Sequence, residues 1–164
     1  MNATKKDVLL DMMAACHDDP SWYPTFRQSI DGLSAEEATW KANDSSHSIW
    51  QLVNHLTYWN ERWMRRFTGE EIFKSIGKNN DMTFEITIDT SEENWQSAVK
   101  RLDATYTQWR SAIVECPESK LDANIPDYPE GCPWWAGLSN LCTHNTYHIG
   151  QIIFIRKQQG SWEG

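Results

Sequence analysis

Apolar side chains recur three and four positions apart along most of the chain, which is the spacing of one face of an α-helix. The clearest run extends from Ile49 to Phe67, and the residues that make its apolar stripe are Ile49, Leu52, Val53, Leu56, Trp59 and Trp63. The pattern predicts four helical segments, over residues 5–31, 46–69 and 91–117 and a last one that includes 138–155. We therefore expect an all-α fold in which these stripes meet in one core.

The expected ends of these segments carry ordinary capping signals. Pro20 should interrupt the first segment, because proline suits only the first turn of a helix, and Gly32 should end it. Ser34 and Glu37 have the spacing of a capping box and predict a single short turn. Gly69 predicts the end of the second segment.

Two connections lack a helical period. Residues 69–90 form a long one, in which 83–88 can be a short extended piece, and the other is a loop with Pro126, Pro129 and Pro133. Such a length in a bundle is what a crossover between two helices lying in the same direction requires.

Composition favours one domain over residues 1–164, long enough to bury about 70% of the surface of the unfolded chain. The four cysteines include no Cys-x-x-Cys pair, so we expect free thiols in a reducing compartment. The polar N-terminal residues and the absence of any apolar run near 18 residues predict a soluble, cytoplasmic protein that does not span a membrane.

The formal net charge of −8 argues against a nucleic-acid partner, because the chain would repel a phosphate backbone. We interpret the basic cluster of Arg62, Arg65 and Arg66 as a solvated helix face. Ten tryptophans can supply core area and also the walls of a cavity for a flat or apolar ligand, and Trp50 or Trp59 is expected to flank such an opening.

Histidines are the candidate chemical groups. His144 and His148 lie four residues apart in the last helix, so both imidazoles stand on one face and can reach one metal ion. His55 falls on the apolar stripe of the second segment and is the best third ligand. A single buried histidine is more often a hydrogen-bonded core residue, but three inward imidazoles without an ion leave several polar groups to satisfy.

Three imidazoles without a fourth protein ligand are typical of a catalytic rather than a structural metal site. Cys142 is two residues from His144 and faces elsewhere, so we expect a small core residue. His17 and His47 lie near helix ends and are expected to be capping or surface groups.

Some polar side chains near the three histidines can fix the orientation of the imidazoles, and ordinary hydrogen bonding elsewhere in the bundle is an equal alternative for them. These candidates are Asn54, Tyr58, Asn145, Tyr147 and Gln151. Gly150, inside a helix, predicts close approach by a neighbouring helix or subunit.

The segments 46–56 and 144–152, with the run His-x-x-x-His-x-Gly-Gln represented here by His144, His148, Gly150 and Gln151, resemble the DinB-like family. The resemblance extends from about residue 21 to 162. It implies a four-helix bundle in up-down-down-up order with a long crossover between helices 2 and 3, a homodimer, and a divalent metal held by His55, His144 and His148.

The resemblance also implies a function, since relatives are described as metal-dependent hydrolases or as transferases that use low-molecular-weight thiols. We expect an enzyme in which zinc or nickel, with iron, copper or manganese as alternatives, activates a bound water or thiol against a small-molecule substrate. The alternative is a non-catalytic metal-binding or ligand-binding helical bundle, which a test of turnover would distinguish.

Overall fold

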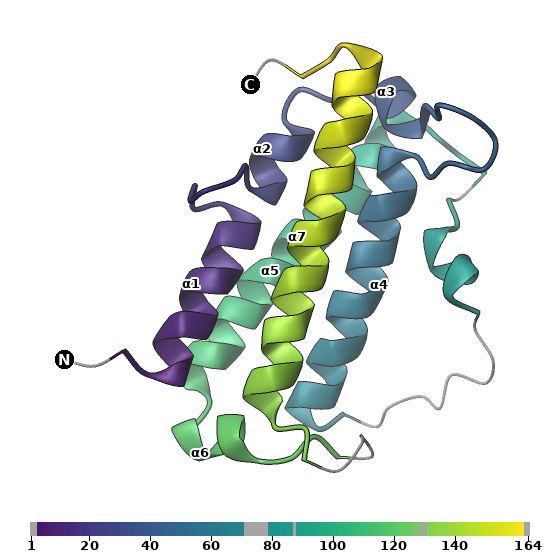
Figure 1. Cartoon of the computed structure of the whole chain (residues 1–164). Coiled ribbons are helices and arrows are strands. Elements are labelled where there is room, and N and C mark those ends of the chain that lie inside the picture. The colour runs from purple at the N-terminus through teal and green to yellow at the C-terminus, as the bar shows by residue number, and fades with distance from the viewer. Residues whose placement is uncertain (1–2, 71–78, 87, 127, 129–130, 163–164) are drawn as a thin grey trace.

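The computed structural model describes residues 3–70, 79–86, 88–126, 128 and 131–162. Within these ranges all regular secondary structure is helical, apart from one isolated bridge between Asn124 and Pro133. The four long helices are α1 (Lys5–His17), α4 (Ile49–Thr68), α5 (Glu92–Glu115) and α7 (Trp134–Gln159). They lie side by side as a bundle (Figure 1). The predicted all-α bundle is confirmed.

The order of the helices around the bundle decides which faces meet. Helix α4 packs against α5 and α7, and α1 packs against the same two helices from the other side. In Figure 1, α1 and α7 rise towards the end where the chain's C-terminus lies, while α4 and α5 descend. Because α4 and α7 are neighbours, the two faces on which histidines were predicted lie against each other.

Side-chain caps mark the starts of α1, α4, α5 and two short helices, whereas α7 begins after Pro133 without one. Helix α4 begins at Ile49, with the Ser48 hydroxyl accepting a hydrogen bond from the Gln51 amide. It ends at Thr68 and is capped by Gly69, whose φ of +80° suits glycine. The short helix α3 (Ala35–Thr39) has the capping box predicted for Ser34 and Glu37. A cap of this kind contributes about 1 kcal/mol of helix stability.

Several boundaries differ from the prediction. The first segment breaks after His17 and resumes only as α2 (Phe26–Ile30), because Pro24 as well as Pro20 lies in the interval. A further short helix, α6 (Glu118–Asp122), follows α5, and α7 already begins at Trp134. Residues 71–78 of the long connection and Pro129 of the proline-rich loop lie outside the described residues.

The extended piece predicted within 83–88 is wrong for the residues that the structure describes there. Thr83 and Phe84 instead end a 3-10 helix, η1 (Asn80–Phe84), that packs on α4. An isolated strand would leave its backbone groups without a neighbouring strand to pair with, whereas the 3-10 turn lets the Thr83 hydroxyl donate to the Asn80 carbonyl at 2.6 Å.

The core lies between the four long helices and contains many of the aromatic side chains. Trp95 and Trp109 are 1% and 0% exposed, and their indole N–H groups donate to the carbonyls of Leu33 and Asn60 at 2.9 and 3.2 Å. Burial of these large side chains is favourable because their one polar atom is satisfied.

Gly150 is an exposed position, and a Cβ atom there would meet nothing within 4 Å. The predicted close approach is therefore wrong for a neighbouring helix of this chain, and approach by a second subunit stays a prediction. In α7 the close contact is instead at Gly137, because a Cβ atom there would lie 2.6 Å from the Cδ1 atom of Ile125.

All four cysteines are unpaired, as predicted. Cys16, Cys116 and Cys142 are buried, so Cys142 is the core residue that was expected, and Cys132 is half-buried. No helix in the described ranges has the length and apolar character needed to cross a membrane.

Candidate metal centre

Helices α4 and α7 bring the three predicted histidines together. The Nε2 atom of His144 lies 3.1 Å from Nε2 of His55 and 3.1 Å from Nε2 of His148. One ring nitrogen from each residue falls within 4.8 Å of the other two. His55 and His148 are 3% and 6% exposed, and His144 is partly buried, so the cluster faces the inside of the bundle with one side towards a cavity.

Hydrogen bonds at the far side of two rings fix which nitrogen is protonated. The Thr83 hydroxyl donates to the Asn80 carbonyl, so its oxygen is left to accept a 2.6 Å bond from Nδ1–H of His55. Nδ1–H of His148 donates to the Gln151 side-chain carbonyl at 2.7 Å. Both residues therefore carry their proton on Nδ1 and direct an Nε2 lone pair to the centre of the cluster.

The cluster also favours the neutral imidazole, which is the form that binds metals. Burial, together with the neighbouring histidines, lowers the pKa of His55 from 6.5 to about 3. Burial and His148 lower the pKa of His144 to about 4. Burial also lowers the pKa of His148, although the bond to Gln151 opposes this shift.

This donor set fits one divalent metal ion. Metal–nitrogen bonds of about 2.0–2.1 Å at a tetrahedral angle place two ligand nitrogens about 3.3 Å apart, close to the separations of 3.1 Å found here. Without an ion, two lone pairs would face a third nitrogen that can donate only one proton. Among the described residues the group contains three ligands, which leaves room for an exchangeable fourth.

An aromatic stack holds the His55 ring on one side. The Phe84 ring lies 4.0 Å from the His55 ring and 3.8 Å from the His47 ring, nearly parallel to both. His47 itself is exposed and precedes the N-cap Ser48, as a surface group should. Phe84 and Thr83 were missed in the sequence because η1 lies in a connection without a helical period, where their contact with His55 has no local signal.

The open side of the cluster faces a cavity of about 550 Å³ between α4, α7, η1 and the loop before α7. Its lining residues are His55, Trp59, Trp63, Asn80, Phe84, Tyr128, Cys132, Gly137, Asn140, Leu141, His144, Tyr147 and His148. Trp59 was correctly expected at this opening. The same expectation for Trp50 is wrong. Trp50 is 2% exposed, its ring centre lies 5.4 Å from that of Trp95, and it borders a different cavity between α4 and α5.

Of the five residues proposed to orient the imidazoles, Gln151 forms the hydrogen bond to His148 described above. Tyr147 packs its ring 5.0 Å from that of His148. The other three bond elsewhere: Asn145 pairs with the buried side chain of Asn60, Asn54 donates to the Glu85 carbonyl, and Tyr58 accepts from Arg62.

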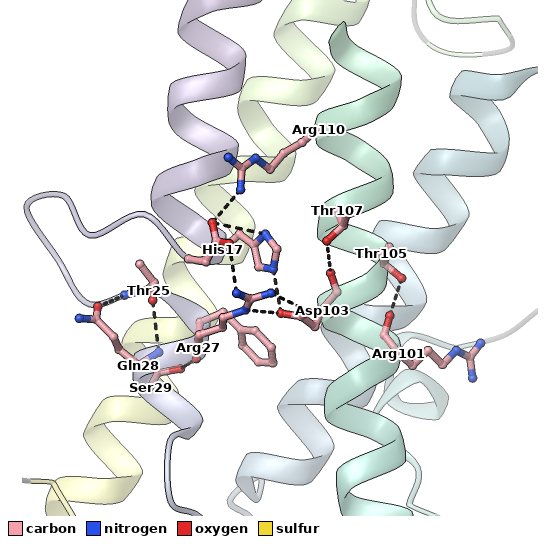
Figure 2. A network of polar contacts seen from close by, with 12 residues as sticks. His17, Thr25, Arg27, Gln28, Ser29, Arg101, Asp103, Thr105, Thr107 and Arg110 are labelled. Carbon is pink, nitrogen blue, oxygen red and sulfur yellow. Dashed lines mark hydrogen bonds and ion pairs between the residues drawn. The ribbon is translucent and has the colours of Figure 1, made fainter. Parts of the chain in front are cut away.

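The expectation that His17 is a capping or surface group is wrong, since this side chain is only 1% exposed. Figure 2 shows His17 at the end of α1, facing Asp103 of α5, with an Nε2–Oδ1 distance of 2.8 Å. Arg27 donates to both oxygens of Asp103, at 2.6 and 3.0 Å, and Arg110 binds Asp18. Charged side chains from α2, from α5 and from the residue after α1 thus surround His17, and its position in the sequence does not reveal this burial.

The basic cluster on α4 is only partly a solvated face. Arg65 is exposed, but the guanidinium groups of Arg62 and Arg66 lie 5.7 and 5.5 Å from the ring centres of Trp59 and Trp63. Arg66 also donates to the Pro126 carbonyl at 2.8 Å. The two arginines therefore cover the outer edge of the aromatic wall.

Comparisons with known proteins agree with this architecture. The family model described as the DinB superfamily matches residues 23–152, which is more than half of the chain. A solved structure titled "YfiT from Bacillus subtilis is a probable metal-dependent hydrolase with an unusual four-helix bundle topology" is similar, with a TM-score of 0.66 and 16% identity over 97% of this chain and 87% of that one. No curated protein matches the sequence.

Proposed function

The chain belongs to the DinB superfamily, and from this membership and its histidine cluster we propose that it is a metal-dependent enzyme that binds one divalent ion through His55, His144 and His148. The observation that carries the proposal is the convergence of three Nε2 atoms, with separations of 3.1 Å from His144 to each of the other two. Two of these atoms are held unprotonated by hydrogen bonds on the opposite side of the ring.

The chain's own residues prepare the site before any ion arrives. Thr83 and Gln151 hold the rings of His55 and His148 in one orientation, so little ordering is needed on binding. Phe84 on one side and the indoles of the cavity wall on the other limit access of bulk water. When bound, a divalent ion supplies Lewis acidity, which lowers the pKa of a coordinated water or thiol.

We propose hydrolysis first and thiol-dependent group transfer second as the reaction class. The similarity to YfiT, which is described as a probable metal-dependent hydrolase, supports this order, and the remaining open position at three histidines suits either nucleophile. Zinc or nickel is the proposed ion, because imidazole donors suit both. Iron and copper, which imidazole also binds, and manganese are the alternatives. The proposed substrate is a small molecule, given a cavity of about 550 Å³.

Elemental analysis of protein purified without a chelator tests the metal. One divalent ion per chain is expected in the wild type and in His47→Ala, which removes an exposed histidine outside the cluster. The triple variant with His55, His144 and His148 changed to Ala should contain none. Stoichiometric metal in the triple variant would overturn the assignment.

Turnover is tested by a screen of the metal-loaded protein against esters, amides and electrophiles, with and without added thiols. Activity that disappears in the triple variant supports an enzyme. If the metal-loaded protein turns over none of these substrates, with or without thiols, the alternative of a non-catalytic metal-binding bundle is favoured.

We further propose a homodimer, as family resemblance suggests. Light scattering at micromolar concentration should give twice the mass of the 164-residue chain. A monomeric mass would remove the dimer and leave the metal site untouched.

A further inference from the structure

The cavity above the histidines has an aromatic wall. Trp59 and Trp63 of α4 stand on one side, and Tyr128 and Tyr147 border the same space from the loop before α7 and from α7. The rings of Trp63 and Tyr128 are 5.5 Å apart and inclined at 64°. The two indoles are half-buried and the two tyrosines are exposed at 42% and 63%, so all four rings keep a face that a flat ring can contact at small entropic cost.

The lining residues that the structure describes carry no formal charge. Among those that the structure describes, none is a lysine, arginine, aspartate or glutamate, and the polar side chains away from the cluster include the amides of Asn80 and Asn140. The nearest cations on α4 are already engaged: Arg62 donates to the Tyr58 hydroxyl at 3.0 Å, and Arg66 donates to the Pro126 carbonyl. A charged group on a ligand tail would therefore lose its water without gaining an opposite charge.

A cationic tail would meet a further obstacle. The guanidinium groups of Arg62 and Arg66 lie over Trp59 and Trp63, so the indoles that could attract a ligand cation already hold one. A divalent ion held by three neutral imidazoles would keep its full positive charge at the base of the cavity. The base therefore favours an oxygen or sulfur donor, and the wall favours an uncharged ring.

Building on the metal-dependent function proposed above, we propose that the substrate is a small molecule with an uncharged aromatic ring that lies between Trp59, Trp63 and Tyr147, next to an oxygen or sulfur atom that reaches the histidine cluster. Aryl esters, aryl amides and aryl thiols are members of this class. Substrates whose tail carries a carboxylate or an ammonium group are outside it.

Binding of imidazole probes to the cobalt-loaded protein tests this class without any need for turnover. Imidazole, 4-phenylimidazole, 4-cyclohexylimidazole and 4-(imidazol-4-yl)benzoate share one metal-binding head and differ in the tail. The visible bands of Co²⁺ report on the head, and tryptophan fluorescence reports on the tail. We expect 4-phenylimidazole to bind at least about tenfold more tightly than imidazole, equivalent to about 1.4 kcal/mol, and more tightly than the cyclohexyl and benzoate probes.

Variants locate the ring. Trp59→Leu and Trp63→Leu should each remove most of the preference for the phenyl probe while imidazole binding stays. Trp22→Leu is the matched control, because Trp22 is 98% exposed and does not line the cavity. Circular dichroism confirms that each variant is folded.

The possible failures are distinguishable. Cobalt bands with equal affinity for imidazole and 4-phenylimidazole would overturn the substrate class alone. Tighter binding of the benzoate probe would also overturn it and would point to anion recognition by Arg62 or Arg66. Absence of cobalt bands in the wild type would overturn the metal-dependent function and this inference with it.

Discussion

Thr83 accepts a 2.6 Å hydrogen bond from Nδ1–H of His55, 28 positions earlier in the chain. The bond joins η1 to the first half of α4, and the Thr83 hydroxyl donates its own hydrogen bond to the Asn80 carbonyl. One threonine in a connection thereby determines which nitrogen of a buried histidine is free to bind a metal.

Removal of this hydroxyl should weaken metal binding without unfolding the bundle. Thr83→Val keeps the shape of the side chain but leaves Nδ1–H of His55 unpaired, so we expect metal affinity to fall by about 10- to 100-fold. Thr83→Ser should retain near wild-type affinity. Competition with a chromogenic chelator measures the change, and Thr105→Val, which removes a buried hydroxyl bonded only within α5, is the control. Unchanged affinity in Thr83→Val would show that the bond does not orient His55.

A bound ion should also stabilise the fold by mass action. Zinc at about 100 times its dissociation constant adds about 2.7 kcal/mol, which raises the melting temperature of a chain of this size by about 5–10 °C. His148→Ala should keep its helical circular dichroism and show little of this rise. Calorimetry with and without zinc decides the matter, and an equal rise in wild type and variant would place the bound ion elsewhere.

Acid should destabilise the metal-free protein. Burial first, and then the neighbouring histidines, lower the pKa of His55 to about 3 and that of His144 to about 4, while both titrate near 6.5 when unfolded. Between these values the unfolded chain binds more protons, so this stability is present above pH 6.5 and is lost as the pH falls towards 3. Urea unfolding near pH 5 should show an uptake of about two protons from these residues, and about one in His144→Gln. Identical pH slopes in the two proteins would contradict the prediction.

The network around His17 should contribute stability and no metal affinity, because it joins α1, α2 and α5 rather than α4 and α7. Asp103→Asn removes the charge that accepts bonds from His17 and Arg27, and should cost about 2 kcal/mol of unfolding free energy. Glu61→Gln, which disturbs the more exposed pair with Arg101, should cost less than about 1 kcal/mol. Urea denaturation compares the two, and an equal cost would mean that the buried histidine adds nothing.

Two glycines of α7 should respond oppositely to alanine. Gly150→Ala meets open space, so the better helix propensity should stabilise the chain by up to about 1 kcal/mol. Gly137→Ala places a Cβ 2.6 Å from Cδ1 of buried Ile125 and should cost about 1 kcal/mol or more. Thermal melts measure both. A destabilised Gly150→Ala that also loses dimer mass would indicate that a second subunit packs at that position.

The sequence by itself determined the elements whose signals are local. A stripe of apolar residues at helical spacing specifies α4, Ser48 and Gly69 specify its ends, and the four-residue spacing of His144 and His148 places both on one face of α7. These features depend only on residues within one or two helical turns along the chain, so the sequence pattern is enough to predict them.

Tertiary structure decided what depends on contacts between distant segments. His17 has the same local appearance as a surface histidine, and only the packing of α1 against α5 and α2 buries it beside Asp103. Thr83 lies in a segment without helical periodicity, and only the packing of η1 against α4 brings its hydroxyl to His55. The physical reason is the same in both cases: burial and long-range hydrogen bonds are properties of the assembled core, and no spacing along the chain encodes them.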